Sequence, residues 1–291
     1  MSNSGISESN PPSNGNIGYL SQEQIDFFDK NGYVIVDFGF DESKLDALVT
    51  ELHPCYNPEH LRAPSFGARI QDAWKFIEPS HYLATQKNVL SALEQLFHRK
   101  PLPFQTLNFP VGTQQATHSD TIHFNSLPSG YMAGVWVALE DIDEENGPLE
   151  YYPGSHKLPE ITMQDAGLEP GYQNYPDYEA FIAKHVKETG IEAAYGYMPK
   201  GHALIWHANL LHGGSKQNDT RRTRHSQVTH YFFEDCQYFT PMHSKPGKPA
   251  FRQPEWIEPG NFVYRPPNPT APAAEPVNSV RRLVNWLKRK I

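Results

Sequence analysis

The feature that most constrains the fold is a series of short apolar runs in the later part of the chain. These runs are rich in β-branched and aromatic residues, and turn-forming residues separate them. They span 104–109, 135–139, 149–152, 203–207 and 228–233. Several short strands that follow a helical start indicate a mainly β protein with helices packed on one side.

The helical start is marked by local signals. Ser21 with Gln24 three residues later forms a capping box, and Gly32 supplies a stop. The run 33–38 then predicts a strand by its β-branched content. A second helix is expected after Asp41, and a third over 88–97. Their apolar faces would consist of Leu45, Leu48, Val49 and Leu52, and of Val89, Leu93, Leu96 and Phe97.

We expect three parts in the chain. Residues 1–18 are rich in Ser, Asn, Gly and Pro, which predicts a disordered tail. Residues 19–240 would form one domain, in which 158–190 is a lid-like insertion. Residues 241–291 would form a Pro-rich extension that ends in a basic helix. That helix could pack on the β-core, contact a partner chain or lie on an anionic membrane surface.

Charge and composition narrow the class of partner. The net charge of −8 and the pI near 5.9 argue against nucleic acid as the main ligand. The two cysteines, Cys55 and Cys236, have no metal-ligand spacing, and a chain of 291 residues does not depend on one disulfide. No apolar run reaches transmembrane length. We therefore expect a cytoplasmic monomer or homodimer that acts on a small molecule, with no membrane partner.

A candidate metal site lies in the stretch His118-Ser119-Asp120. On a strand, residues i and i+2 face the same side, so this imidazole and this carboxylate could reach one ion. His212, in Leu-Leu-His-Gly-Gly, could supply a third ligand. Two histidines and one carboxylate form the facial triad of non-haem Fe(II) oxygenases. The chain has fourteen histidines, however, so chance patterns are common, and His123 and His207 compete for the third position.

The residues after His212 add a second signal. A tight Gly turn leads into a cluster of arginines just before the strand 228–233. An arginine there could hold a carboxylate through two parallel hydrogen bonds. For Arg221 and Arg222 we favour a solvated basic loop.

At these residues the chain resembles the phytanoyl-CoA dioxygenase family, which includes ectoine hydroxylase. The resemblance runs from about residue 20 to 235, and its motifs are specific only in combination. They are His118-Ser-Asp120, Trp136-Val-Ala-Leu139, Asn146-Gly-Pro-Leu149, Pro153-Gly-Ser-His156, His212-Gly, Asn218-Asp-Thr220 and Arg224.

The resemblance implies a double-stranded β-helix, or jelly roll, that binds Fe(II) and uses 2-oxoglutarate and dioxygen as co-substrates. The implied iron ligands are His118, Asp120 and His212. Arg224 would pair with the far carboxylate of 2-oxoglutarate, because it lies four residues past Thr220 as in the family. Asn108 would make a polar contact to the co-substrate. Trp136 would line the same pocket or simply pack in the core.

The chain departs from the family pattern at two places, and it retains the carboxylate ligand that bears on the outcome of the reaction. The distal motif reads His-Gly-Gly-Ser where the family usually has His-Gly-Ser, which leaves the role of Ser215 open. Gly201-His202 stands where Gly-Asp is common. Related iron halogenases lack the carboxylate ligand, so the presence of Asp120 favours hydroxylation over halogenation.

The expected function is therefore an Fe(II)- and 2-oxoglutarate-dependent dioxygenase. It would hydroxylate a C–H bond of a small molecule in natural-product or small-metabolite biosynthesis. Desaturation, epoxidation and ring formation use the same iron site and stay open. So do a non-catalytic jelly-roll binding protein and a Zn(II) site with non-redox chemistry. Candidate substrate-pocket residues lie in 123–131, at Tyr151 and in 172–197.

Overall fold

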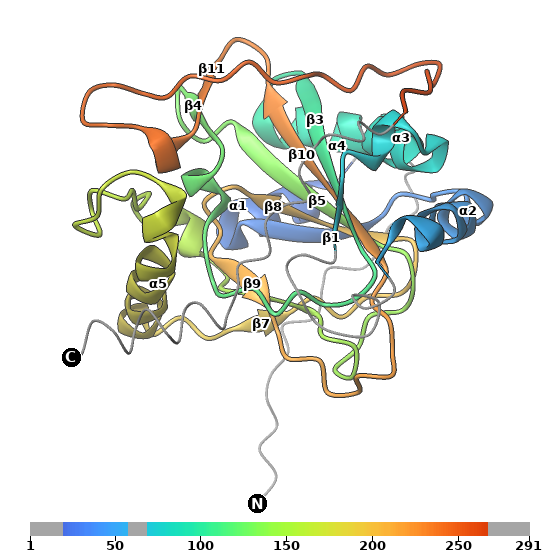
Figure 1. Ribbon diagram of the computed structural model, residues 1–291, viewed down its shortest axis with the longest axis horizontal. Coiled ribbons are helices and arrows are strands. Elements are labelled where there is room, and N and C mark those ends of the chain that lie inside the picture. Colours follow the sequence, from blue (N-terminus) through green and yellow to red (C-terminus); the bar gives the residue numbers. More distant parts are fainter. Residues whose placement is uncertain (1–19, 58–68, 267–291) are drawn as a thin grey trace, which may run out of the picture.

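A computed structural model describes residues 20–57 and 69–266 of the chain (Figure 1). Six strands form an antiparallel main sheet in the order β1-β8-β5-β10-β3-β2. They are β1 (Tyr33–Asp37), β2 (Ile70–Gln71), β3 (Pro101–Phe109), β5 (Met132–Ala138), β8 (His202–His207) and β10 (Ser226–Phe233). Neighbours that are far apart in sequence give this sheet the interleaved topology of a jelly roll.

A smaller sheet packs against the inner face of the main sheet. Its order is β7-β6-β9, and a separate two-stranded ribbon pairs β11 with β4. The bounds are β4 (Asn125–Leu127), β6 (Leu149–Tyr151), β7 (Ala194–Tyr195), β9 (His212–Gly214) and β11 (Gln237–Phe239). Tyr151 of β6 shares one apolar cluster with Trp136 of β5 and Leu204 of β8, so this core lies between the two sheets.

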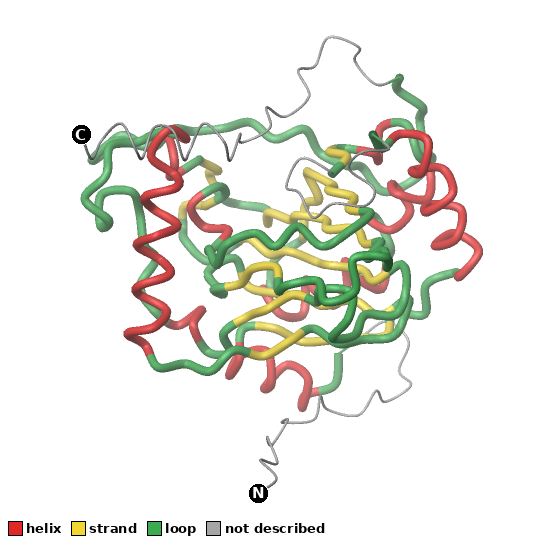
Figure 2. The backbone as a smooth tube through the Cα atoms, turned by 60° about the horizontal axis from the view of Figure 1, so that its bottom comes forward, coloured by secondary structure: helices red, strands yellow, loops and turns green. Residues whose placement is uncertain are grey.

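Helices cover the outer face of the main sheet, as Figures 1 and 2 show. They are α1 (Gln22–Asn31), α2 (Glu42–Leu52), α3 (Glu78–Ala84) and α4 (Lys87–Phe97). Leu45 of α2 and Leu93 of α4 are fully buried in the same cluster as Val135 of β5. The predicted mainly β fold with helices on one side is confirmed.

The local signals act as the sequence indicates. Ser21 accepts a hydrogen bond from the Gln24 backbone N–H at 3.2 Å, and the Gln24 side chain accepts one from Ser21 N–H at 2.9 Å. Gly32 ends α1 with φ 81°, a left-handed conformation that glycine adopts without strain. Asp41 caps α2 by accepting from Ser43 N–H at 2.9 Å. Both predicted helices are therefore fixed at their first turns.

Alternation along β5 and β10 separates two environments. In β5, Ala133, Val135 and Val137 face the helices, whereas Trp136 and Ala138 face the inner core. In β10, Val228 lies beside Trp136 on the inner face. His230 follows two residues later, so its side chain also points inward. The inner face therefore carries polar residues of β10 between the two sheets.

The strand expected around His118 and Asp120 is wrong. His118 makes only an isolated bridge with His212, and Asp120 begins the 3₁₀-helix η4 (Asp120–Ile122). Helix α3 and the strands β2, β4, β7, β9 and β11 were not predicted. The strands have two or three residues each, and α3 has seven, too few for a periodic pattern to stand out.

The segment 158–190 contains the longest described helix, α5 (Tyr175–Thr189), preceded by η6 (Tyr172–Asn174). In Figures 1 and 2, α5 stands at the edge opposite α2. Its buried side chains Tyr178 and Ile182 pack with Ile122 and Leu211. This apolar contact fixes the helix beside the segments that carry Asp120 and His212.

The chain continues to pack after residue 240. Met242 is fully buried, and Ile257 is 1% exposed against Trp74 and Ala84. The packed region therefore extends beyond the domain boundary expected from the sequence. The predicted N-terminal tail and the predicted basic C-terminal helix lie outside the described residues. Among the helices of 20–57 and 69–266, none is long and apolar enough to cross a membrane.

Candidate metal centre

Two backbone segments bring His118 and His212 side by side. Each residue donates its backbone N–H to the carbonyl of the other, both at 2.9 Å, and the ring centroids are 4.5 Å apart. The two glycines after His212 permit this approach. A Cβ on Gly213 would lie 2.8 Å from the carbonyl oxygen of Gln115, and one on Gly214 would lie 2.9 Å from the Gln114 nitrogen. The Gly-Gly pair thus lets the 114–118 segment lie directly against β9.

The side chains of His118, Asp120 and His212 converge. Asp120 Oδ1 lies 3.7 Å from His118 Nε2 and 4.0 Å from His212 Nε2. All three residues are buried, and their candidate ligand atoms lie within 4.8 Å of one another. A metal ion with bonds of about 2.1 Å would need only small side-chain movements to contact all three.

Both histidines are held in the tautomer that a metal requires. His118 Nδ1 lies 2.9 Å from the carbonyl of Ala116, and His212 Nδ1 lies 3.0 Å from the carbonyl of Leu210. A carbonyl can only accept, so each Nδ1 carries the proton and donates. Each Nε2 then keeps its lone pair for a cation, which is the usual arrangement around metal-binding histidines.

The second carboxylate oxygen of Asp120 is occupied. Trp206 Nε1–H donates to Asp120 Oδ2 at 2.8 Å, and His230 Nε2 lies 3.8 Å from the same oxygen. This leaves Oδ1 as the oxygen that faces the two histidines. Gly134 makes room for the indole, because a Cβ there would lie 2.2 Å from Trp206 Cζ2. A strand glycine therefore allows the indole that orients the carboxylate.

The charges at the centre favour a divalent cation. Burial alone would raise the pKa of Asp120, but the neighbouring histidines, His212 above all, hold it well below its usual range. Burial lowers the pKa of His212 and of His230 to about 4. Burial also acts to lower the pKa of His118, but the neighbouring Asp120 carboxylate raises it overall. An ionised carboxylate between histidine nitrogens with free lone pairs fits a first-row transition metal.

Arg224 is a buried cation on the approach to β10. Its side chain is 2% exposed, and the guanidinium carbon lies 5.2 Å from the Trp136 ring centroid. Burial lowers the pKa of Arg224 to about 10. Among the described residues its Nε–H has no hydrogen-bond partner, and no carboxylate forms an ion pair with it. A buried guanidinium without a partner is costly, so this side chain fits an anionic ligand.

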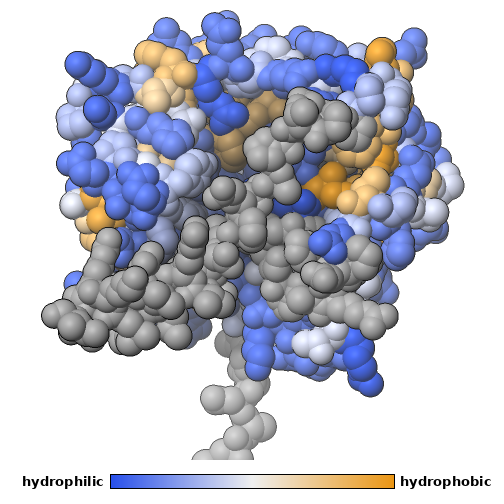
Figure 3. Space-filling view, in the orientation of Figure 1, coloured by the Kyte–Doolittle hydropathy of each residue, from blue (hydrophilic) through white to orange (hydrophobic). Residues whose placement is uncertain are grey.

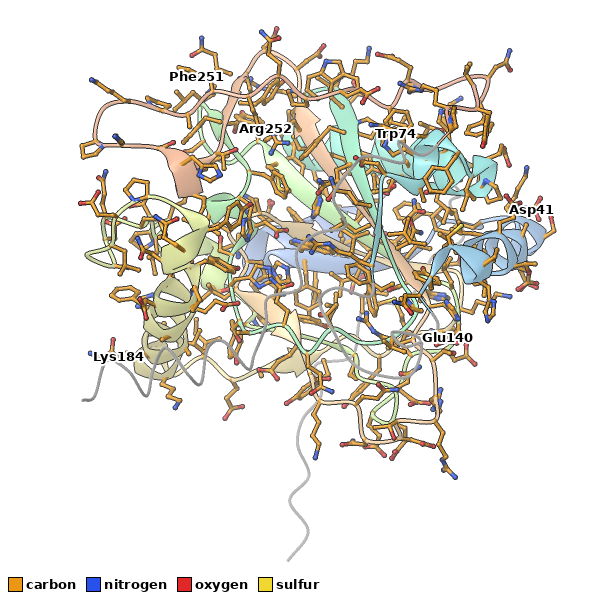
Figure 4. The ribbon with its side chains drawn as sticks, viewed as in Figure 1. Asp41, Trp74, Glu140, Lys184, Phe251 and Arg252 are labelled. Carbon is orange, nitrogen blue, oxygen red and sulfur yellow. The ribbon has the colours of Figure 1, made fainter. Side chains whose placement is uncertain are left out.

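Glu140 holds the segment that carries Arg224 without bonding to its guanidinium. The carboxylate, labelled in Figure 4, accepts from Thr223 Oγ1 at 2.7 Å and from the His225 backbone N–H at 2.9 Å. The Arg224 backbone N–H donates to the Pro110 carbonyl at 2.9 Å. These bonds fix the direction in which Arg224 leaves the backbone.

The structure separates the remaining predicted residues. Trp136 is fully buried in the inner core and contacts Arg224, so it both packs and borders the cation. Asn108 is not brought to this group. Its Nδ2–H donates to Gln227 Oε1 at 2.9 Å, and Gln227 in turn donates to the Ser80 carbonyl at 3.0 Å beside α3. Asn108 therefore lies on the helix-covered face of the sheet.

The nearby loop residues also have defined partners. Ser215 Oγ–H donates to the Pro148 carbonyl at 2.8 Å. Arg221 is exposed and pairs with Asp219 at 2.8 Å, and Arg222 pairs with Asp143 at 2.6 Å. Arg221 therefore lies in a solvated loop as predicted, whereas Arg222 is half-buried.

Sequence reasoning missed Trp206 and His230. Trp206 lies within an apolar run that looks like an ordinary buried strand. His230 is one of fourteen histidines in the chain and lies in a run of aromatic residues. Trp206 and His230 are recognised as neighbours of Asp120 only once β8 and β10 are placed on either side of β5. Alternation would have placed His230 on the same face as Val228, but no motif marks it.

Comparisons with known proteins agree with this geometry. The family model for phytanoyl-CoA dioxygenase (PhyH) matches residues 28–226. The peroxisomal phytanoyl-CoA dioxygenase of Rattus norvegicus is 24% identical over 250 residues, which cover 76% of this chain and 71% of that protein.

Solved structures share the fold at low identity. EctD from S. alaskensis, solved with 2-oxoglutarate and 5-hydroxyectoine, superposes with a TM-score of 0.59 at 18% identity, covering 84% of this chain and 87% of that one. The epimerase SnoN, solved with Fe3+, alpha ketoglutarate and nogalamycin RO, gives a TM-score of 0.59 at 20% identity and covers 81% and 98%.

Proposed function

Because the chain belongs to the phytanoyl-CoA dioxygenase family, we propose that it is an Fe(II)- and 2-oxoglutarate-dependent dioxygenase that hydroxylates a C–H bond of a small molecule. The observation that carries the proposal is the buried convergence of His118, Asp120 and His212. Three ligands from two short segments leave the other coordination positions open, as this chemistry requires.

In this proposal the first residues to act are the metal ligands. His118 and His212 would bind Fe(II) through Nε2, and Asp120 would bind it through Oδ1. Trp206 donates to the other carboxylate oxygen, Oδ2, which would leave Oδ1 for the metal. The hydrogen bonds at each Nδ1 hold both imidazole rings against rotation.

Arg224 anchors the co-substrate. Its guanidinium would bind the carboxylate of 2-oxoglutarate that is remote from the metal, through two parallel hydrogen bonds. The support is its burial without an acidic partner and its fixed backbone. Trp136 packs against the guanidinium and keeps water from it. Asn108 is left out of this proposal, because its amide is engaged with Gln227 on the other face.

Iron, when bound with 2-oxoglutarate and dioxygen, would supply the oxidising power. 2-Oxoglutarate would lose carbon dioxide and take one oxygen atom of dioxygen to become succinate, and the other oxygen atom would enter the C–H bond of the substrate. The chain orients the substrate and excludes water around the metal. We propose a small-metabolite or natural-product substrate. Two proteins of the same fold support this, since their structures contain 5-hydroxyectoine and nogalamycin RO.

The test is turnover of 2-oxoglutarate. Purified protein with Fe(II), 2-oxoglutarate and dioxygen is expected to form succinate, and Zn(II) in place of Fe(II) is expected to give none. His212→Ala should reduce succinate formation at least 100-fold, because a ligand is lost. His53→Ala removes an exposed histidine and serves as the matched control. Succinate formation that is equal in His212→Ala and the wild type would overturn the assignment.

A further inference from the structure

One cation beside the metal centre has no role in the chemistry described so far. Arg252 lies on the segment after β11, beyond residues 28–226 that the family model matches. Its backbone N–H donates to the Tyr238 carbonyl at 2.8 Å, which ties this segment to β11. Figure 4 shows the Arg252 side chain directed inward over the strands, whereas the neighbouring Phe251 points away and is 59% exposed.

Aromatic rings, not acids, hold the Arg252 guanidinium. Its central carbon lies 4.9 Å from the ring centroid of Phe124 and 5.3 Å from that of Phe104. Among the described residues it forms no ion pair and no side-chain hydrogen bond. Burial lowers the pKa of Arg252, and the nearby Tyr172 and Asp72 act in the opposite direction. Asp72 itself accepts hydrogen bonds from Trp74 and Thr106.

The same rings connect Arg252 to the metal centre. The ring of Phe124 lies 5.0 Å from that of His230, and His230 Nε2 lies 3.8 Å from Asp120 Oδ2. These separations put the guanidinium within about 10 Å of the His230 ring. Contacts through Phe124 and His230 therefore connect the Arg252 guanidinium to Asp120.

Apolar side chains surround the Arg252 guanidinium. Figure 3 shows that the face presented in Figure 1 is largely hydrophilic, with apolar patches between the hydrophilic residues. Phe104 and Phe124 belong to this apolar side of the centre, with Phe232 stacked on Phe104 at 4.4 Å. An apolar wall with one guanidinium at its edge matches a ligand that has a hydrocarbon body and one anionic end.

We propose that Arg252 binds an anionic group, a carboxylate in the first instance, of the substrate that is oxidised at the His118, Asp120 and His212 centre. The proposal rests on the dioxygenase function proposed above and names the class of its substrate. Phe104 and Phe124 hold the guanidinium flat by cation–π contact, so the N–H groups at its edge stay available for two parallel hydrogen bonds. The apolar part of the substrate would then lie over the rings, toward Asp120.

The assignment differs from that of Arg224. Arg224 is buried beside Trp136 in the core between the sheets, whereas Arg252 lies next to Phe124 and Tyr238 at the end of β10. One guanidinium therefore serves the co-substrate and the other serves the substrate. If Arg224 and Arg252 both bound 2-oxoglutarate, adding 2-oxoglutarate would prevent any other carboxylate from binding to Arg252.

The experiment uses matched pairs of acids and neutral amides: hexanoate with hexanamide, phenylacetate with phenylacetamide, and 4-phenylbutyrate with 4-phenylbutyramide. Their binding to the full chain is measured by calorimetry, first without metal and then with Fe(II) and saturating 2-oxoglutarate under nitrogen. At least one acid is expected to bind at least tenfold more tightly than its amide, and 2-oxoglutarate is expected not to displace it.

Variants assign this preference to one residue. Arg252→Gln should remove the acid preference, and Arg252→Lys should retain part of it with stronger dependence on salt, because lysine acts as a point charge. Lys184→Gln is the control, since it removes an exposed positive charge on α5 that pairs with Glu188 of the same helix (Figure 4). Thermal melting of each variant shows whether loss of binding reflects loss of folding.

Each contrary result has its own meaning. If no acid binds more tightly than its amide, if Arg252→Gln keeps the preference in folded protein, or if 2-oxoglutarate displaces the acid, the substrate assignment is wrong. Visible absorption of the Fe(II) and 2-oxoglutarate samples is recorded in parallel. An acid preference without any metal-dependent band would overturn the dioxygenase function and leave the anion site standing.

Discussion

At the residue scale, the account depends on how Asp120 is held. A carboxylate that is free to rotate can bind a metal through both oxygens and close a position that a co-substrate needs. The Trp206 indole prevents this, because its Nε1–H donates a hydrogen bond to Asp120 Oδ2 at 2.8 Å and the Trp206 side chain is only 2% exposed. Trp206 is therefore a positioning residue that acts on the metal through Asp120.

Replacing Trp206 by Phe should weaken Fe(II) binding by about 10- to 100-fold, because the ring remains but the hydrogen bond to the metal-binding carboxylate is lost. Anaerobic titration with Fe(II) measures the effect. Trp74→Phe is the matched control, since Trp74 Nε1–H donates at 3.3 Å to Asp72, which is not a metal ligand (Figure 4). Equal iron affinity in Trp206→Phe and the wild type would contradict the positioning role.

The sequence identifies the metal ligands better than their surroundings. His118, Asp120 and His212 stand in motifs with fixed spacing, and the structure brings all three together. Trp206 and His230 reach Asp120 only because β8 and β10 are placed within one sheet, and that placement depends on strand order. The sequence also supplied Asn108 as a candidate, but strand alternation turns its side chain toward α3.

At the element scale, β5 contributes side chains to the apolar clusters on both faces of the main sheet. Its glycine, Gly134, makes room for the Trp206 indole. Gly134 pairs with Trp206 of β8 in the sheet register. Larger residues on both sides of Gly134 along the strand are buried, so the backbone cannot shift away easily. The position is therefore sensitive to a single methyl group.

Gly134→Ala should destabilise the protein by about 1–3 kcal/mol, because the new Cβ would overlap the Trp206 ring. It should also weaken Fe(II) binding, since the indole that orients Asp120 must move. Urea unfolding and Fe(II) titration measure the two effects. Gly196→Ala is the comparison, because its backbone is not in the left-handed region and a Cβ there would meet its nearest atoms at 3.5 Å, an ordinary van der Waals contact. A Gly134→Ala protein with unchanged iron affinity would argue against this coupling.

Helix α5 offers a second test at this scale. Ile182 is fully buried against Ile122 and Leu211, which adjoin Asp120 and His212, whereas Leu93 of α4 is fully buried on the far side of the main sheet. Ile182→Ala and Leu93→Ala should each lose about 2–5 kcal/mol of unfolding free energy. Only Ile182→Ala should also weaken Fe(II) binding in protein that is still folded.

This pair of variants separates a wall of the site from general packing. Unfolding followed by fluorescence gives the stability, and iron titration at low temperature gives the affinity of the folded fraction. If both variants weaken iron binding equally, α5 has no special role at the metal centre.

The long elements α1, α2, α4, β3, β5, β8 and β10 are predictable because their patterns repeat over at least five residues.

At the scale of the whole molecule, the packed structure includes a C-terminal segment that composition alone sets apart. Residues after 240 are rich in proline, which predicted an extension. Yet the Ile257 backbone N–H donates to the Pro103 carbonyl at 2.8 Å, and Glu255 pairs with Lys75 at 2.7 Å and with Arg265. Proline-rich sequence lacks a regular period, so only contacts with the rest of the fold reveal that it packs.

Ile257→Ala should lower the unfolding free energy by about 2–4 kcal/mol, because its side chain is 1% exposed between Trp74 and Ala84. Val263→Ala is the control, since Val263 is 70% exposed and should change stability by less than about 0.5 kcal/mol. Chemical denaturation measures both. A loss at Ile257 no larger than that at Val263 would mean that the segment does not stabilise the domain.

The central claim is that one buried centre binds Fe(II) and 2-oxoglutarate together. The most direct test is anaerobic visible absorption of the full chain with both added. The wild type should show a metal-to-ligand charge-transfer band, and Asp120→Ala and Arg224→Ala should weaken it. Arg222→Ala should retain it, because Arg222 pairs with Asp143 at the surface. No band in the wild type with Fe(II) and 2-oxoglutarate in excess would contradict the account.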